Sequence, residues 1–343
     1  MGYRVVVVGA TGNVGREILN TLVERKFPIS EIQAVASSIS IGQRVSFGDD
    51  DILDVIPITD FDFTGFDFAL FAAGSLVSAE FGPIAAEAGC IVIDNSSHFR
   101  QEQEIPLIVP EVNPGALSCY QECNIIANPN CVTIPLTMAL KPLHDAAGLK
   151  RVVVSTYQSV SGAGRAAMDE LFNQTRAIFM NQPVIKEEFP KQIAFNIIPQ
   201  VDSFLPDGTT FEETKVSVET QKILDAEVGM AVTCVRVPVF IGHSIAVAVE
   251  LENPLSVEEA RALWRKFPGL SVIDYRQEDG YVTPAEVVGE DSVFLSRIRS
   301  DKSVENGLLF WIVSDNLRKG AALNAVQIAE TIVRDYLAPH RLA

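Results

Sequence analysis

The sequence has no apolar run near the roughly 18 to 20 residues of a membrane-spanning helix, and its start, MGYRVVVVGA, lacks a signal-peptide layout. It has no cluster of Lys and Arg, and with 44 acidic against 27 basic residues its net charge of −17 opposes nucleic-acid binding. Its five cysteines lie at irregular positions that match neither a disulfide framework nor a zinc site. These absences predict a cytoplasmic protein with no bound metal, no membrane contact and no nucleic-acid partner.

The first third of the sequence alternates strand-like and helix-like segments. A β-branched run at Tyr3–Val8 ends in Gly9, and apolar residues then recur at helical spacing over Asn13–Lys26. Because continuous apolar strands that alternate with helices are typical of a parallel sheet, the pattern predicts a doubly wound α/β domain. Further strands are expected at Glu31–Ala36, Phe68–Ala72 and Cys90–Asp94, with Pro83–Ala88 in a helix between the last two.

The pattern changes after about residue 130, and 343 residues exceed a typical single domain. Several of the later apolar segments alternate with period two, which predicts an α+β domain with an open sheet. The final segment, Gly320–Leu337, has Ala325, Ile328, Ile332 and Leu337 on one face and is expected to form a long helix. The expected strands are Arg151–Tyr157, Ala194–Ile198, Met230–Pro238 and Ser244–Leu251.

A glycine-rich turn, GATGNVG, follows the first strand and opens the first helix. Glycines there permit a tight turn and close backbone approach, while the helix N-terminus offers N–H groups to a pyrophosphate. The spacing is GxxGxxG and not GxGxxG, but its place between strand and helix predicts dinucleotide binding. The residues expected to contact the cofactor are Gly9, Thr11, Gly12, Asn13 and Val14.

The end of the second strand, followed by Ser37, Ser38, Ile39 and Ser40, lacks the Asp or Glu that would bind a ribose 2′-hydroxyl. Serines can donate to a 2′-phosphate, so the segment favours NADP(H) over NAD. The alternative is that these serines only cap a turn.

Cys131 lies in NPNCVTIP, directly before an apolar helical run. A helix N-terminus lowers the pKa of a thiol and favours a nucleophilic thiolate, so Cys131 is the candidate nucleophile. Cys90 and Cys234 are expected to be buried packing residues. Cys119 and Cys123 are left unassigned.

His243 ends the segment RVPVFIGH, which begins at Arg236. A strand that carries Arg236 toward a turn that carries His243 can bring a guanidinium and an imidazole into one cleft. A cysteine before a helix and a distant histidine are typical of nucleophilic cysteine catalysis. His98, His144 and His340 have no such context.

Five separated segments then resemble the bacterial aspartate-semialdehyde dehydrogenase family, in the right order along the chain. They are NPNC at 128–131, TYQSVSGAG at 156–164, EETK at 212–215, RVPVFIGH at 236–243 and SDNLRKGAALNAVQIAE at 314–330. The resemblance implies a GAPDH-like fold. Its Rossmann domain covers residues 1–130 and is completed by the C-terminal helix at about 320–338, and a catalytic and dimerisation domain covers 131–319. It also implies a homodimer or homotetramer.

The resemblance implies a role for each site residue. Cys131 is the nucleophile, Gln158 orients the substrate, and His243 is the acid/base that takes the hydroxyl proton as hydride leaves. Substrate and phosphate are bound by Arg236 at the carboxylate, Glu212 at the ammonium, and Arg100 with Lys215 at the phosphate. Arginine forks suit carboxylates, and Arg/Lys pairs suit phosphate, although Arg100 alone could equally be a solvated charge.

On the cofactor side the resemblance assigns Ser161, Gly162 and Asn316 to the nicotinamide end. Similar enzymes usually have an arginine where this chain has Ile39, which weakens the preference for NADP; Arg44 is near enough in sequence to substitute.

The implied reaction is NADP-dependent reductive dephosphorylation of L-aspartyl 4-phosphate to L-aspartate 4-semialdehyde and inorganic phosphate, through a cysteine thioester, in lysine, methionine and threonine biosynthesis. An acetylglutamyl-phosphate reductase would share the chemistry, but Glu212 argues against an acylated amine. A short-chain reductase would require a Tyr with Lys four residues later, which the chain lacks. A non-catalytic member of the family would not need Cys131, Gln158 and His243 together.

Overall fold

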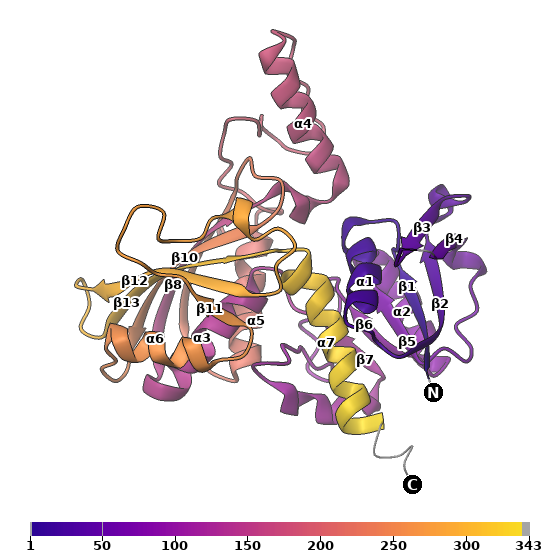
Figure 1. Cartoon of the computed structure of the whole chain (residues 1–343), viewed down its shortest axis with the longest axis horizontal. Helices are drawn as coiled ribbons and strands as arrows, with labels where there is room; N and C mark the ends of the chain where they lie inside the picture. The colour runs from indigo at the N-terminus through magenta and orange to yellow at the C-terminus, as the bar shows by residue number, and fades with distance from the viewer. Residues whose placement is uncertain (1, 50, 338–343) are drawn as a thin grey trace. The chain divides into compact units, whose positions relative to one another are not determined.

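A computed structural model describes residues 2–49 and 51–337, and the chain forms two compact units. Unit 1 contains residues 1–130 and 321–343, and unit 2 contains Cys131–Gly320. Each unit has its own β-sheet (Figure 1). Position 338, the expected end of the last helix, and His340 lie outside the described residues.

The sheet of unit 1 has seven strands in the order β3-β4-β2-β1-β5-β6-β7. All neighbours pair in parallel except β3 and β4, which form an antiparallel edge. The predicted parallel sheet is therefore confirmed, and the antiparallel edge strand β3 is an addition that was not predicted. The short connection through Gly48 can join only antiparallel neighbours. The strands are β1 Tyr3–Val8, β2 Ile29–Ala36, β3 Arg44–Phe47, β4 Asp51–Pro57, β5 Phe68–Phe71, β6 Ile91–Asp94 and β7 Ile125–Ala127.

Helices cover both faces of this sheet. The α1 helix (Asn13–Glu24) leads from β1 to β2, whereas α2 (Ser75–Glu87) leads from β5 to β6 in the opposite direction along the sheet. Right-handed crossovers therefore place α1 and α2 on opposite faces. The four strands and the first helix predicted in this unit are confirmed within two residues at each end.

The expected C-terminal helix is confirmed as α7 (Leu323–Ile332), flanked by π-helical turns at Arg318–Ala322 and Val333–Leu337. Its apolar face joins α1 and the strands in the core of unit 1: Ala325, Ile328 and Ile332 are buried, and Leu337 packs against them. Asn324 donates from Nδ2 to Asn128 Oδ1 at 2.7 Å, which fixes α7 against the end of β7.

Unit 2 contains a six-stranded mixed sheet in the order β11-β12-β13-β10-β8-β9. The central β10 is antiparallel to β8 and β13, while β8 and β9 are parallel. An α+β domain is therefore confirmed. The strands are β8 Leu149–Gln158, β9 Gly229–Arg236, β10 His243–Leu251, β11 Leu270–Val272, β12 Val293–Asp301 and β13 Gly307–Ser314.

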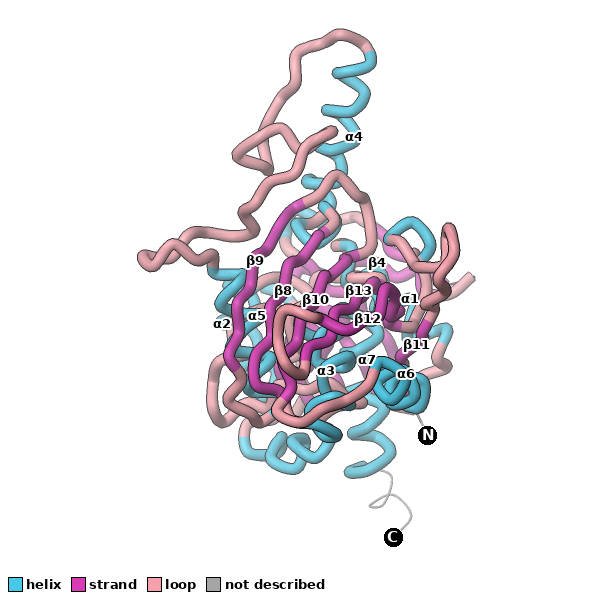
Figure 2. The backbone as a smooth tube through the Cα atoms, turned by 90° about the vertical axis from the view of Figure 1, so that its left-hand side faces the viewer, coloured by secondary structure: helices cyan, strands magenta, loops and turns pink. Residues whose placement is uncertain are grey.

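Three helices, α3 (Thr133–Ala147), α5 (Phe211–Leu224) and α6 (Val257–Lys266), lie on one face of this sheet (Figure 1). The indole of Trp264 is fully buried and donates to Ala139 O at 2.8 Å, which joins α6 to α3. The opposite face is turned to the viewer in Figure 2, and the half-exposed rings of Tyr157 and Trp311 lie on it, with centroids 5.3 Å apart. The α4 helix (Arg165–Phe179) projects away from the sheet.

The strand expected at Ala194–Ile198 was wrong. Phe195 has φ +56, which a strand does not adopt, and only Ile198 forms an isolated bridge, to Arg236. The apolar alternation instead reflects packing, because Ile193, Ala194 and Ile198 bury their side chains in a small cluster with residues of α4. No helix within residues 2–49 and 51–337 is long and apolar enough to cross a membrane.

The turn after β1 depends on two glycines that meet main-chain atoms. A Cβ on Gly9, whose φ is +84, would lie 2.4 Å from Ala72 O. A Cβ on Gly15 would lie 2.1 Å from Gly9 O, so α1 can pack against the turn only because Gly15 has no side chain.

Gly15→Ala is therefore expected to lower the free energy of unfolding by about 1 to 3 kcal/mol, because the obstacle is main chain that cannot rotate away. Gly115→Ala in the same unit is the control, since its Cβ would meet nothing within 4 Å. Chemical denaturation of the two variants checks this. An equal free energy of unfolding in the two variants would show that the turn can shift to accommodate a methyl group at little cost.

Candidate active site

The N-terminus of α1 in unit 1 is shaped to receive an anion. Gly12 is the N-cap residue, and it supplies no side-chain acceptor to the first-turn N–H groups. A Cβ on Gly12 would meet Gly9 O at 3.4 Å. The first turn also contains no acidic residue. An anion placed here would accept hydrogen bonds from these N–H groups and would lie at the positive end of the helix dipole. The residues present therefore fit a dinucleotide pyrophosphate.

The segment after β2 lies beside this turn. Thr11 Oγ1 and Ser40 Oγ are 3.3 Å apart, and Ser40 is buried. Ser37 and Ser38 are exposed, and Ile39 is 91% exposed. Arg44 lies on β3, where its Nε donates to Asp54 Oδ1 at 2.9 Å in an exposed ion pair. Exposed ion pairs are weak, so this contact does not prevent Arg44 from pairing with another anion.

Arg100 is buried in unit 1, which excludes the alternative of a solvated charge. Its Nε donates to Asn128 O at 3.0 Å and its Nη2 to Asn95 O at 2.7 Å. These carbonyls follow β7 and β6, so the guanidinium is held at the carboxyl ends of two parallel strands, where ligands bind in open α/β sheets.

Cys131 in unit 2 is half-buried and lies directly before Val132, the N-cap residue of α3. Gly320 lies against it: a Cβ on Gly320 would be 3.2 Å from both Cys131 Cβ and Cys131 O. The position before the helix is as predicted. The close approach of Gly320 was not predicted, although it lies inside the quoted 314–330 segment.

Three strand ends meet in unit 2. Arg236 closes β9, His243 opens β10, and Ser159 follows the end of β8. Ser159 N donates to His243 Nδ1 at 3.0 Å, and Arg236 Nη1 donates to Ser159 O at 2.7 Å. The expected meeting of the Arg236 guanidinium and the His243 imidazole is therefore observed, with the main chain of Ser159 between them.

The glycine of the following turn opens the space in front of these side chains. A Cβ on Gly162 would lie 3.1 Å from His243 Nε2 and 3.3 Å from Arg236 Nη1. A methyl group at this position would thus touch both side chains.

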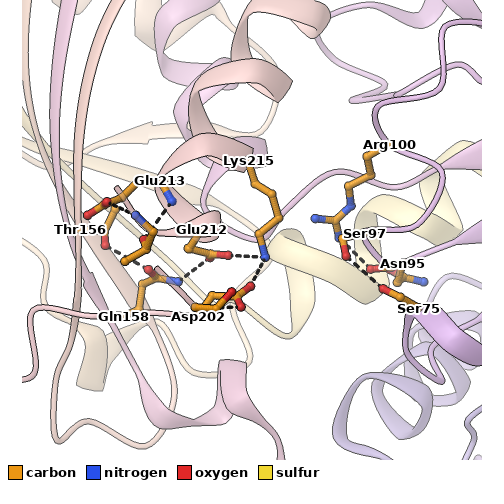
Figure 3. A network of polar contacts seen from close by, with 12 residues as sticks. Ser75, Asn95, Ser97, Arg100, Thr156, Gln158, Asp202, Glu212, Glu213 and Lys215 are labelled. Carbon is orange, nitrogen blue, oxygen red and sulfur yellow. Dashed lines mark hydrogen bonds and ion pairs between the residues drawn. The ribbon is translucent and has the colours of Figure 1, made fainter. Parts of the chain in front are cut away.

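A second polar cluster leads from Gln158 to the carboxylates of α5 and the 202 loop (Figure 3). Gln158 Nε2 donates to Glu212 Oε1 at 3.0 Å, and Thr156 Oγ1 donates to Gln158 Oε1 at 3.1 Å. Lys215 Nζ lies 2.7 Å from Glu212 Oε2 and 3.0 Å from Asp202 Oδ2. The structure thus brings Gln158, Glu212 and Lys215 together and adds Asp202, which lies in none of the quoted motifs.

Burial and charge shift the pKa values of these groups. Burial lowers the pKa of Arg236, against the opposing influence of Glu212 and Cys131, which places all three in one electrostatic cluster. Burial alone would lower the pKa of Lys215, but its pairs with Glu212 and Asp202 raise it overall. Burial and then the Arg236 charge lower the pKa of His243 to about 3, although Glu212 acts in the opposite sense. His243 is therefore neutral near pH 7.

Two of the remaining cysteines are packing residues as predicted. Cys90 and Cys234 are fully buried, and burial raises the pKa of the Cys90 thiol to about 12 and that of Cys234 as well. Cys119 and Cys123 are half-buried.

Asn316 connects the loops that carry these groups. Its Oδ1 accepts from Gly242 N at 2.9 Å and from Ser159 Oγ at 3.0 Å, and its Nδ2 donates to Ser161 Oγ at 2.9 Å. Sequence reasoning assigned Asn316 and Ser161 to the cofactor only. Their internal network was missed because hydrogen bonds between loops leave no spacing pattern in the sequence.

Comparison with known proteins gives matches over both units. The family described as semialdehyde dehydrogenase, NAD binding domain, matches residues 4–119, and that described as semialdehyde dehydrogenase, dimerisation domain, matches residues 140–319. The aspartate-semialdehyde dehydrogenase of Rickettsia bellii (strain RML369-C) is 51% identical over 335 residues, which cover 98% of this chain and 99% of the relative. The chain belongs to the aspartate-semialdehyde dehydrogenase family.

Other members of the family are similar to this chain over nearly its full length. The enzyme of Aquifex aeolicus (strain VF5) is 49% identical over 339 residues, covering 98% of this chain and 100% of the relative. The crystal structure of aspartate semialdehyde dehydrogenase II from Vibrio cholerae complexed with ASA has a TM-score of 0.95 and 46% identity, and the match covers 98% of this chain and 99% of that one. The two-domain fold and the NAD(P)-binding domain at the N-terminus follow from these matches.

Gly162→Ala is expected to reduce kcat/KM for the semialdehyde by at least about tenfold, because the methyl group would fill the space before His243 Nε2 and Arg236 Nη1. The fold should persist, since Gly162 is exposed and needs no positive φ. Steady-state kinetics and thermal melting check both points.

The control is Gly229→Ala, whose nearest contact would be an ordinary 3.4 Å to Lys150 O. Full activity in Gly162→Ala would show that substrate does not use this space.

Proposed function

We propose that the chain catalyses reversible, NADP-dependent reductive dephosphorylation of L-aspartyl 4-phosphate to L-aspartate 4-semialdehyde through a thioester on Cys131. The observation that carries the proposal is the meeting of Arg236 and His243 at the Ser159 main chain, in the unit that also contains Cys131 before α3. It occurs in a chain whose curated relatives carry the name of this enzyme. The Vibrio cholerae relative was solved complexed with ASA. The reductive direction would serve lysine, methionine and threonine biosynthesis.

The chemistry begins at Cys131, where the thiolate attacks the aldehyde carbon. The resulting thiohemiacetal oxygen lies before His243 Nε2, the acid/base position that the family resemblance implies. A nicotinamide cofactor, held by the residues of unit 1 and unit 2 assigned below, would supply the hydride chemistry: it would accept the hydride in oxidation and return it in reduction. Inorganic phosphate then cleaves the Cys131 thioester, and the reverse sequence consumes the acyl phosphate.

Substrate binding is assigned to the charged groups of unit 2. The buried Arg236 fork suits the α-carboxylate, and the Glu212 carboxylate suits the α-ammonium. Glu212 already pairs with Lys215, so an incoming ammonium would share this carboxylate and release part of the Lys215 charge for phosphate. Arg100 of unit 1 is the second group proposed for phosphate. An acylated amine would leave Glu212 without a cation to bind, which disfavours an acetylglutamyl substrate.

Cofactor binding is assigned to unit 1, with Gly9, Thr11, Gly12, Asn13 and Val14 at the pyrophosphate. NADP is proposed over NAD because Ser37 and Ser38 are exposed beside this turn and no carboxylate follows β2 there. Ser40 is buried and supports the turn through Thr11, whereas Ile39 extends into solvent. The nicotinamide end is assigned to Ser161, Gly162 and Asn316 of unit 2.

Unit 2 is also proposed to form the subunit contact of a homodimer or homotetramer. The match to a dimerisation domain and the sheet face that carries half-exposed Tyr157 and Trp311 support this. The functional domains are accordingly 1–130 with the C-terminal helix, and 131–319.

Cys131→Ser is expected to reduce NADPH formation from aspartate semialdehyde and phosphate by at least about a thousandfold, because an alkoxide is far less available than a thiolate. Binding of NADP, measured by calorimetry, should persist. Acetylglutamate semialdehyde, tested in the same assay with the unaltered chain, should be a poor substrate.

The control is Cys119→Ser, a half-buried thiol outside the site, which should keep full activity. Activity of Cys131→Ser within about tenfold of the unaltered chain would falsify the thioester mechanism.

Ile39→Arg is expected to raise the ratio of kcat/KM for NADP to that for NAD by about tenfold, because it places a guanidinium where the 2′-phosphate is proposed to bind. Ile52→Arg adds the same charge at another exposed position of unit 1 and should leave the ratio unchanged. A preference for NAD in the unaltered chain would contradict the cofactor assignment.

A further inference from the structure

The amine of Lys215 lies between two carboxylates from different segments of unit 2. Its Nζ is 2.7 Å from Glu212 Oε2, one turn earlier on α5, and 3.0 Å from Asp202 Oδ2, in the loop before this helix (Figure 3). The side chains of Lys215 and Glu212 are 12% and 6% exposed, whereas that of Asp202 is 37% exposed. Asp202 is thus the outer partner of the amine, and the reaction proposed above assigns it no role.

The backbone of the loop fixes the direction of the Asp202 side chain. Asp202 has φ +70, a conformation that Asp and Asn tolerate better than most residues, and its Oδ1 accepts from Ser203 N at 2.8 Å. Ser203 O accepts in turn from Phe211 N at 2.8 Å, at the start of α5. Oδ2 is therefore the oxygen that faces Lys215. An asparagine can replace Asp202 and keep both the φ angle and the bond to Ser203 N.

The charges of Glu212, Asp202 and Lys215 balance only when a further cation is bound. The two carboxylates supply two negative charges, and the lysine supplies one positive charge. The α-ammonium proposed to bind Glu212 would bring the second positive charge, after which each carboxylate has a cation. Arg236 also acts on Glu212, but its proposed partner is the substrate carboxylate, so that pair adds no net charge.

Without the Asp202 carboxylate, Lys215 alone would neutralise Glu212. A substrate ammonium would then enter a group with no net charge to attract it and would have to compete with the lysine for one carboxylate. The outer carboxylate therefore decides how strongly the inner one attracts a second cation.

We propose that Asp202 is a specificity-determining residue: it pairs with Lys215 and so leaves Glu212 with the negative charge that selects a substrate bearing a free ammonium. Asp202 is a positioning residue, because it acts through Lys215 and does not itself bind the substrate. The inference deepens the proposed function and rests on its assignment of the substrate ammonium to Glu212.

The contacts of Glu212 show which of its partners can move. Gln158 Nε2 donates to Glu212 Oε1 at 3.0 Å, and Gln158 is itself held by Thr156 Oγ1 at 3.1 Å. Lys215 has a flexible four-carbon stem and a second carboxylate within reach. An arriving ammonium therefore displaces Lys215 toward Asp202, and the largely buried amine keeps a partner throughout.

The same pairing affects phosphate, the other ligand proposed for Lys215. Asp202 competes with a phosphate oxygen for the amine and places a negative charge beside the incoming anion. Loss of the Asp202 carboxylate should therefore strengthen phosphate binding while it weakens selection of the ammonium. A loss of local structure would weaken both, so the two opposite directions separate this role from a merely structural one.

The test compares aspartate semialdehyde with 4-oxobutanoate, the same molecule without its amino group, in the Asp202→Asn variant. We expect the ratio of their kcat/KM values to fall by about fivefold to tenfold, and the KM for phosphate to fall by about twofold to threefold. The ratio does not depend on the fraction of folded enzyme, so it decides the matter even if the variant is less stable. An unchanged ratio or a raised phosphate KM overturns the proposal.

The matched control is Asp207→Asn, which removes an exposed carboxylate from the same loop; its Oδ1 accepts from Thr209 N at 3.0 Å. It should leave both quantities unchanged. If Asp207→Asn lowers the ratio as much as Asp202→Asn does, the effect belongs to the overall charge of the loop and the proposal is wrong.

The action through Lys215 is tested in a Lys215→Met background. There Asp202→Asn should change the ratio by less than about twofold, because the amine through which Asp202 acts is gone. A change as large as in the otherwise unaltered chain overturns the proposal. If the unaltered chain itself turns over both compounds equally well, the assignment of the ammonium to Glu212 fails, so failure of the proposed function is distinguishable from failure of this inference.

Discussion

The main chain of Ser159 hydrogen-bonds to two side chains, one of which is an acceptor and the other a donor. Its N–H donates to the His243 imidazole, and its carbonyl accepts from the Arg236 guanidinium. Both bonds depend on strand register: Gln158 pairs with Arg236 across parallel β8 and β9, and Tyr157 pairs with Ser244 across antiparallel β8 and β10. A one-residue slip of either pairing would turn one of these side chains to the other sheet face. The sheet of unit 2 therefore determines the geometry of the site.

Charged side chains of both signs lie close together in this site, although the sequence as a whole is acidic. Arg236, Glu212 and Lys215 are all largely buried, which is costly unless each charge has a partner. Lys215 is shared between two carboxylates, and Glu212 also accepts from Gln158. A substrate with both a carboxylate and an ammonium can enter such a cluster by exchanging partners, so no isolated charge is created.

Sequence reasoning could select candidate residues where the side chain itself has the chemistry, and the structure bears on where those residues lie. Cys131 before α3 and the Arg236–His243 segment followed from residue type and spacing, and the glycine turn followed from its place between strand and helix. The contacts of Ser159 with His243 and Arg236 were missed because they are made by its main-chain N–H and carbonyl, which nearly every residue type has. Asp202 was missed because its contact with Lys215 depends on a loop. The supposed strand at Ala194–Ile198 failed because apolar alternation also arises where a loop packs on a helix.

Both tryptophans of the sequence, Trp264 and Trp311, belong to unit 2, and their surroundings differ. Trp264 is fully buried, whereas Trp311 is half-buried beside Tyr157 on the opposite sheet face, where its Nε1 donates to Val282 O at 3.3 Å. Indole fluorescence will therefore report on unit 2 alone, with one emitter in its core and one on the sheet face opposite α3, α5 and α6. Melting of the nucleotide-binding unit is silent in that signal and must be followed by circular dichroism, so the two probes together resolve whether the units unfold separately.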